Sequence, residues 1–232
     1  MTMIAMRTLA KWHIWLGWLV GVPIVMWLGT GLLMVARPIE EVRGEHLRMK
    51  RPAAALLLPG SDLAGPDAQL SEMRVQMQNG RAVAVLTALD GSVRRVDFVT
   101  GAGLAPLDAA AARALVAREI TGGDAVERVT LFPANRTPFD FRRPPAVWQV
   151  ALANGTNVYV GRDTGAIEAV RTRWWRAFDL AWGLHIMDLS EREDTSHPLL
   201  IGFAALSLTG ALIGCVLMFR RRRARSAIRQ AA

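Results

Sequence analysis

The chain has 232 residues, 52% of them hydrophobic, and carries a formal net charge of +8. That combination is unusual for a soluble domain, and the distribution explains it, because the longest uncharged apolar runs stand near the two ends. No nucleophile triad, phosphate loop or zinc signature is present, and with only four histidines a metal-dependent hydrolase is not indicated. The sequence therefore assigns no catalytic residue.

Two segments are long and apolar enough to cross a bilayer. Residues 14–36 and 199–219 contain no charged residue, and at a rise of ~1.5 Å per residue each covers a hydrocarbon core of ~30 Å. Pro23 lies inside the first run, where proline is tolerated in membrane helices. We therefore predict two transmembrane helices with a water-soluble domain between them.

Each run has one competing interpretation. A cleaved signal peptide would have an apolar region of ~7–15 residues and small residues before its cleavage point. The first run is longer and ends in Leu33-Met34-Val35-Ala36-Arg37, so we expect an uncleaved anchor. A buried core helix is the alternative for the second run, and the cluster of five arginines at 220–225 argues against it.

Charge near short flanks predicts the orientation. Arg7 and Lys11 precede the first run and the arginine cluster follows the second, and such charge marks the cytoplasmic side. We expect both termini in the cytoplasm and the central domain outside. The basic tail is interpreted as a topology signal that touches anionic lipid, and no nucleic-acid partner is expected.

The central domain is predicted to be α+β. Asn79-Gly80, Asp90-Gly91 and Asn154-Gly155 separate alternating apolar segments, which is a strong hairpin signal. An Ala-rich helix is expected at 107–120, ended by Gly122-Gly123. Strands are expected at 125–132, 146–153, 156–160 and 166–171. We predict an antiparallel sheet covered by one main helix.

A weak internal repeat and an aromatic segment complete the pattern. Residues 95–104 parallel 158–167, each with a strand, Thr-Gly in a turn and a short strand. An amphipathic interfacial segment is expected at 173–197, with tryptophans at both membrane boundaries. Its stretch 173–182 is interpreted as a membrane-surface helix, and the alternative is a surface that lines a cofactor or docks a partner. These interfacial residues are Trp12, Trp15, Trp18, Trp174, Trp175 and Trp182.

The expected organisation has six parts. They are 1–36 (N-terminus and first span), 37–66 (juxtamembrane segment and linker), 67–172 (outer domain), 173–197 (interfacial segment), 198–219 (second span) and 220–232 (basic tail). Gly17-x-x-x-Gly21 lies on one face of the first span, where small residues allow close helix approach, within the hairpin or between copies.

Several of these motifs resemble a known family. Residues 107–170, with Asp163-Thr164-Gly165 before the closing strand, resemble a PepSY domain. The opening His13-Ile14-Trp15-Leu16-Gly17, the segment Trp182-Gly183-Leu184-His185 and His197-Pro198 resemble the PepSY-associated transmembrane family of iron-regulated membrane proteins. The resemblance implies a bacterial inner membrane location and a periplasmic central domain. Members usually have four spans, so this two-span chain corresponds to about half of one, and a homodimer or a membrane protein complex would restore four.

The resemblance also implies b-type haem, because some relatives are haem-bearing reductases of ferric siderophores. Imidazole is the usual axial ligand of such a haem. The candidate ligands are His185 and His197, with His13 as a ligand of a second haem in a dimer. No metal other than haem iron is expected, and His46 is assigned no role. The single cysteine, Cys215, excludes covalent c-type haem.

Two functions are consistent with these features. The first is an inner-membrane haem protein that takes part in electron transfer and serves iron or siderophore reduction. The second is a haem-free, membrane-anchored periplasmic binding or regulatory module that recognises a partner protein or modulates a peptidase. The composition of the chain does not separate them.

Overall fold

The computed structural model describes residues 3–49, 70–195 and 197–230, with side chains up to residue 220. The linker prolines and glycines expected at 52–66 lie outside the described residues. The chain divides into two compact units. The helical unit comprises Met1–Pro38 and Ala177–Ala232, and the outer domain comprises Ile39–Arg176.

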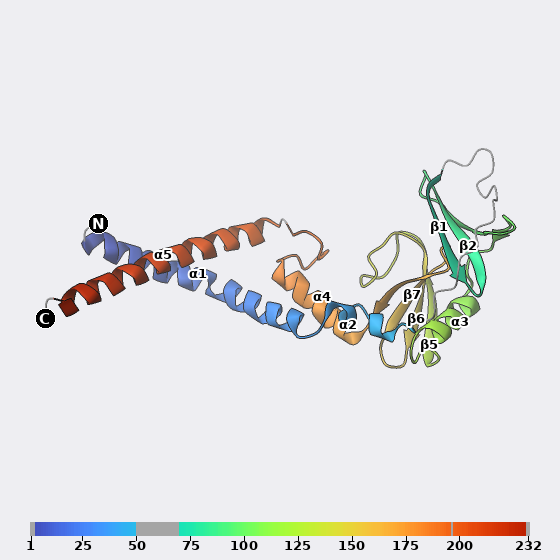
Figure 1. Ribbon diagram of the computed structural model, residues 1–232, viewed down its shortest axis with the longest axis horizontal. Helices are drawn as coiled ribbons and strands as arrows, with labels where there is room; N and C mark the ends of the chain where they lie inside the picture. Colours follow the sequence, from blue (N-terminus) through green and yellow to red (C-terminus); the bar gives the residue numbers. More distant parts are fainter. Residues whose placement is uncertain (1–2, 50–69, 196, 231–232) are drawn as a thin grey trace. The chain divides into compact units, whose positions relative to one another are not determined.

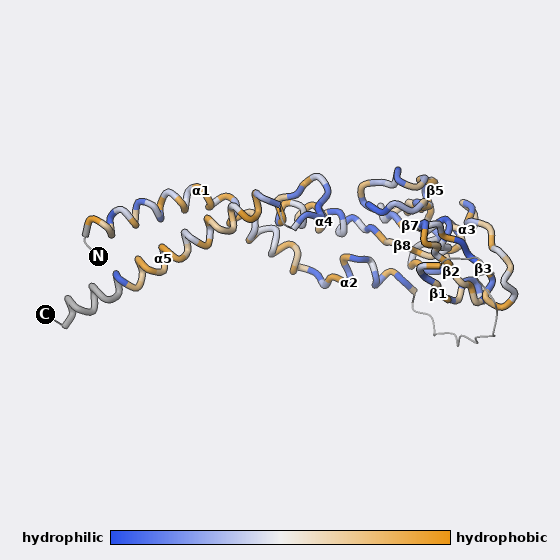
Figure 2. The backbone as a smooth tube through the Cα atoms, turned by 90° about the horizontal axis from the view of Figure 1, so that it is seen from above, coloured by the Kyte–Doolittle hydropathy of each residue, from blue (hydrophilic) through white to orange (hydrophobic). Residues whose placement is uncertain are grey.

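The helical unit contains two long apolar helices, as expected. Helix α1 (Met3–Val35) and helix α5 (Pro198–Gln230) carry the apolar stretches that are coloured orange in Figure 2. In the most apolar 18-residue stretch of each helix, only 11% of the residues of α1 and 6% of those of α5 are buried. A core helix of a soluble protein would be mostly buried, so these helices instead have the length and exposure of membrane helices.

Helices α1 and α5 pack antiparallel, with a stagger. Two contacts show the register. A Cβ built onto Gly210 of α5 would stand 3.7 Å from Leu16 of α1, and Arg220 of α5 contacts Met6 near the N-terminus of α1. In this register the first residue of α5 is level with about residue 28 of α1. The last turns of α1 therefore extend past α5 and are free to contact another element.

Helix α4 (Arg173–His185) is that element, through the part of it that belongs to the helical unit. Trp27 Nε1 donates a hydrogen bond of 2.9 Å to the carbonyl of His185. The loop after α4 folds back on the helix: Arg192 forms an ion pair of 2.5 Å with the buried Asp179. A Cβ at Gly183 would come within 2.9 Å of the Arg192 stem, so this helical position requires glycine.

The outer domain has two separate four-stranded antiparallel sheets, each a simple meander (Figure 1). The first contains β1 (Leu70–Gln78), β2 (Arg81–Ala88), β3 (Val93–Asp97) and β4 (Gly103–Leu104). The second contains β5 (Val126–Phe132), β6 (Val147–Leu152), β7 (Asn157–Gly161) and β8 (Ile167–Arg171). We expected one antiparallel sheet, and the structure shows two, because among the described residues β1–β4 pair only with one another and β5–β8 only with one another; α3 (Ala109–Glu119) lies between the two sets in the chain.

Local turn chemistry sets the hairpins where the sequence placed them. Asn79 and Gly80 both have positive φ, 52° and 76°, which is the backbone of the two-residue turn that fits twisted strands. The internal repeat is also present in three dimensions. Gly101 N donates to Asp97 O, and Gly165 N donates to Gly161 O, each at 2.9 Å, so the β3–β4 and β7–β8 turns share one hydrogen-bond pattern.

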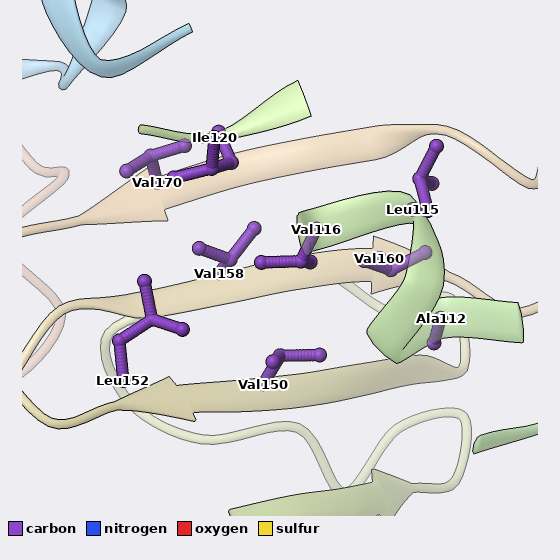
Figure 3. Packing of buried hydrophobic residues seen from close by; sticks show 9 residues of the cluster. All are labelled: Ala112, Leu115, Val116, Ile120, Val150, Leu152, Val158, Val160 and Val170. Atoms are coloured by element: carbon purple, nitrogen blue, oxygen red, sulfur yellow. The ribbon is translucent and has the colours of Figure 1, made fainter. Parts of the chain in front are cut away.

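Helix α3 covers the second sheet. The Asp108 side chain accepts from Ala111 N at 2.7 Å and caps its N-terminus. One face of the helix points into the main core, where the side chains of α3 meet those of β6, β7 and β8 (Figure 3). The nine buried residues of this core are Ala112, Leu115, Val116, Ile120, Val150, Leu152, Val158, Val160 and Val170.

The segment after α1 belongs to the outer domain from Ile39 onward. Helix α2 (Ile39–Val42) and the short helix η1 (Glu45–Leu47) lead into a backbone pairing of Arg48 with Ile120. Leu47 packs against the main core. This domain therefore starts well before residue 67, the expected boundary.

Candidate functional site

His13 lies in the contact between the two long helices. Its Nδ1 is 3.0 Å from the carbonyl oxygen of Gly210. A main-chain carbonyl can only accept, so Nδ1 carries the proton and donates it. The second nitrogen, Nε2, then keeps its lone pair. This is the tautomer that a metal-ligating imidazole adopts when its other nitrogen is held by an acceptor.

His185, the last residue of α4, is held in the same tautomer by α1. Its Nδ1 is 3.0 Å from the hydroxyl of Thr30. The same hydroxyl lies 2.8 Å from the Met26 carbonyl, and with its proton directed there Thr30 accepts from His185 Nδ1–H. A Cβ added at Gly31 would stand 3.9 Å from Cε1 of the ring, an ordinary van der Waals contact. In this tautomer the lone pair of His185 is on Nε2.

His197 is arranged differently. It directly precedes α5, and its Nδ1 accepts a long hydrogen bond of 3.4 Å from the Leu199 backbone N–H. The proton is then on Nε2, the nitrogen that His13 and His185 leave unprotonated. His197 acts as a helix cap, and iron coordination through Nε2 would require it to give up that contact. His46 is exposed on η1.

The structure separates the candidate ligands. His13 and the Thr30 partner of His185 are 17 residues apart on one continuous helix, about 26 Å at 1.5 Å per residue. Within one chain these two histidines cannot bind the same iron. His13 contacts Gly210 and packs over Gly214, and both glycines lie well inside α5. His13 is therefore deeper in the apolar helix pair than its sequence position, just before the first apolar run, indicates.

The glycines at the α1–α5 contact are not the pair that the sequence motif suggested. A Cβ added to Gly17 or Gly21 would meet nothing within 4 Å in this chain. The close approach instead uses Gly214 of α5, where an added Cβ would stand 2.8 Å from the His13 ring, while a Cβ at Gly210 would make an ordinary contact of 3.7 Å with Leu16. Gly17 and Gly21 lie with His13 on an open hollow of about 480 Å³ on α1, whose other lining residues are Ile14, Trp18, Val22 and Val25. Association between copies through this face stays a prediction.

The expected interfacial tryptophans fall into two groups. Trp12, Trp15 and Trp18 are exposed on α1, as lipid-facing residues would be. Trp174, Trp175 and Trp182 on α4 are only half-buried. Trp182 Nε1 donates to the Arg192 carbonyl at 3.0 Å, and the Arg171 guanidinium lies 4.1 Å from the centre of the Trp175 ring. Trp175 and Trp182 thus each have a packing partner within the compact unit to which they belong.

A polar network in the outer domain has no counterpart in the sequence analysis. The fully buried Tyr159 donates its hydroxyl proton to Asp140 and accepts from Gln149 Nε2 at 2.7 Å. Burial raises the pKa of Tyr159, and the Asp140 carboxylate raises it further. Asp140 also accepts from Asn157 at 3.2 Å. The signal in the sequence is weak, because a single tyrosine in a strand is usually interpreted as core.

Among the described residues no group of three or more His, Cys, Asp or Glu side chains could hold a bare metal ion. A search of protein-family models gave no match, and comparisons with curated proteins and with solved structures gave none either. The likeness to PepSY proteins therefore stays a prediction from the motifs quoted above.

Proposed function

We propose that the chain is a membrane haem protein of electron transfer, with His13 and His185 as axial ligands of two different b-type haems. The observation that supports this is a shared geometry: each Nδ1 lies 3.0 Å from an oxygen on a neighbouring helix that can accept its proton, which places the lone pair on Nε2. Iron is bound by a neutral imidazole whose other nitrogen is hydrogen-bonded in this way. When bound, the haem would supply one-electron redox chemistry, and the protein would fix its ligands.

The second axial ligand of each iron would come from a second copy. His13 and His185 lie at two different depths of one hairpin, so a twofold axis along the bilayer normal pairs each histidine with its own equivalent. The open face of α1 beside His13, made of Gly17 and Gly21, provides a flat surface for a helix or a porphyrin. Reduction of ferric chelates is the activity that the family resemblance adds to this proposal.

Haem content measured on the full chain tests the proposal. Protein expressed with ample haem and purified in detergent should show a Soret band and a reducible α band. His13→Ala and His185→Ala should each remove about half of the haem per chain, because each removes the ligand of one haem. His197→Ala is the comparison. It should leave the haem content unchanged, because the His197 ring caps α5 and does not ligate iron in this proposal. His46→Ala, an exposed position, is the control.

An absence of Soret absorbance in the wild type would overturn this proposal in favour of the haem-free binding module. Loss of haem in His197→Ala, with haem retained in His13→Ala, would overturn the assignment of ligands.

A further inference from the structure

A basic hollow lies on the outer domain, away from the histidines. It has a volume of about 760 Å³, and four arginines and two glutamates line it: Arg43, Arg48, Arg143, Arg171, Glu45 and Glu168. We call it the arginine hollow. All of these residues belong to the same compact unit.

The arginine hollow has an excess of positive charge. Four guanidinium groups face two carboxylates. Glu168 is already engaged, because one of its oxygens accepts from Thr164 at 2.6 Å and the other lies 3.7 Å from Arg143. The lining therefore has more positive than negative charge, and such an excess attracts an anion.

The arginines are attached to fixed elements. Arg171 on β8 donates from Nε to the Asp140 carbonyl at 2.8 Å and stacks on Trp175. Burial, and then the neighbouring charge of Arg143, lower the pKa of Arg171, while the charge of Asp140 acts in the opposite direction. Arg48 donates to the Ile167 carbonyl at 3.3 Å. Guanidinium groups held in this way present paired N–H donors, the geometry that suits phosphate oxygens.

One wall of the hollow follows the first apolar helix closely in the chain. Arg43 comes eight residues after Val35, the last residue of α1. Arginine guanidinium groups form paired hydrogen bonds with phosphate oxygens, including those of a lipid headgroup. We propose that the arginine hollow binds a phosphate-bearing anion, namely the headgroup of an anionic phospholipid. A soluble phosphate ester is the other source of the same chemistry. The proposal is independent of haem.

Ligand binding to the full chain tests this inference. Protein in a neutral detergent is titrated with short-chain phosphatidylglycerol, phosphatidylcholine or glycerol 3-phosphate, and bound ligand is counted by native mass spectrometry. The test variant combines Arg43→Gln with Arg143→Gln. The matched control combines Arg113→Gln with Arg128→Gln, which removes the same charge from exposed positions of α3 and β5 outside the hollow. A further variant, Glu45→Gln, removes negative charge from the lining.

Phosphatidylglycerol should bind, and the Arg43/Arg143 variant should weaken its binding roughly tenfold or more. The control should change it less than about twofold, and Glu45→Gln should strengthen it. Binding of phosphatidylglycerol but not of glycerol 3-phosphate identifies the lipid as the source, and equal binding of both identifies a soluble ester. The inference is overturned if phosphatidylcholine binds as well as phosphatidylglycerol, if no probe binds, or if the two double variants behave alike.

Discussion

The imidazole of His13 occupies the space that a side chain on Gly214 would fill. A Cβ at Gly214 would stand 2.8 Å from Cε1 of His13, closer than real contacts allow. The ring sits on this glycine and donates to the carbonyl of Gly210 one turn earlier. Glycine at 214 is thus what allows a histidine to pack inside an apolar helix pair.

Gly214→Ala should therefore weaken the helix pair. The added methyl displaces the His13 ring and its hydrogen bond to Gly210, which corresponds to roughly 1–3 kcal/mol of overpacking. Thermal unfolding in detergent measures the effect. Gly202→Ala, on the same helix but with nothing within 4 Å of the added Cβ, is the matched control. Equal stability of the two variants would contradict the packing of His13 on Gly214.

Thr30→Val tests the hydrogen bond that sets the tautomer of His185. Valine has nearly the shape of threonine but offers no acceptor to Nδ1–H. If His185 binds haem, loss of this partner should lower haem affinity roughly 10–100-fold while the histidine itself remains. Haem titration of the apoprotein measures it. Thr209→Val is the control, since Thr209 bonds only to the carbonyl of Ala205 on its own helix. Unchanged affinity in Thr30→Val would count against ligation by His185.

The features that local chemistry dictates were predictable from the sequence. Asn79-Gly80 forms its turn because these residues adopt positive φ readily, and the two long apolar helices follow from length and apolarity alone. The Asp108 cap likewise places α3 within two residues of its expected start.

The features that depend on distant partners were not predictable. The His13 partner, Gly210, is 197 residues away in the chain, and nothing near His13 indicates which nitrogen it protonates. The Gly17-x-x-x-Gly21 spacing shows that α1 has a small-residue face but not which element covers it. The division into two sheets is likewise decided by pairing between strands, and strand patterns within each segment fit one sheet or two.

Reporter fusions test the orientation inferred from charge. A reporter active only in the cytoplasm should work when fused after residue 229 and fail when fused near Gly122, because the arginines after the second apolar run are costly to translocate. Fusion at residue 10, before the first apolar run, should also be active. The reverse pattern would place the outer domain in the cytoplasm.

Asp188→Asn should loosen the loop before α5. The Asp188 carboxylate accepts from the Ser190 hydroxyl and from the backbone N–H groups of Glu191, Glu193 and Asp194. The Ser190 bond, followed by these backbone bonds, lowers the pKa of Asp188. The carboxylate therefore stabilises the loop above the ordinary Asp pKa of about 3.9, and this stabilisation is lost only as the pH falls through the lowered value.

Amide hydrogen exchange measures that effect at neutral pH. The amides of residues 191, 193 and 194 should exchange faster in Asp188→Asn than in wild type, because a carboxamide offers one acceptor oxygen where the carboxylate offers two. Asp124→Asn, at an exposed position of the outer domain, should leave them unchanged. Equal exchange in wild type and Asp188→Asn would show that the loop does not depend on this carboxylate.

Tyr159 offers the most direct optical test, because it is the only tyrosine in the chain. Any phenolate absorbance at 295 nm must come from it. Burial raises its pKa first of all, and the Asp140 carboxylate adds to the effect by accepting the hydroxyl proton and by its charge. A raised folded pKa means that this residue contributes stability that is fully present below the ordinary tyrosine pKa of about 10 and is lost as the pH rises above it.

The folded chain should therefore show no phenolate absorbance at pH 10, whereas the chain in denaturant should be half ionised there. Asp140→Asn should lower the pKa of Tyr159 without exposing the ring, because it removes the carboxylate charge but not the burial. Tyr159→Phe should abolish the absorbance change. It should also lower the free energy of unfolding by about 1–3 kcal/mol, since Gln149 loses its acceptor and Asp140 its donor. A phenolate signal in the folded protein with an ordinary midpoint would show that Tyr159 is not buried against Asp140.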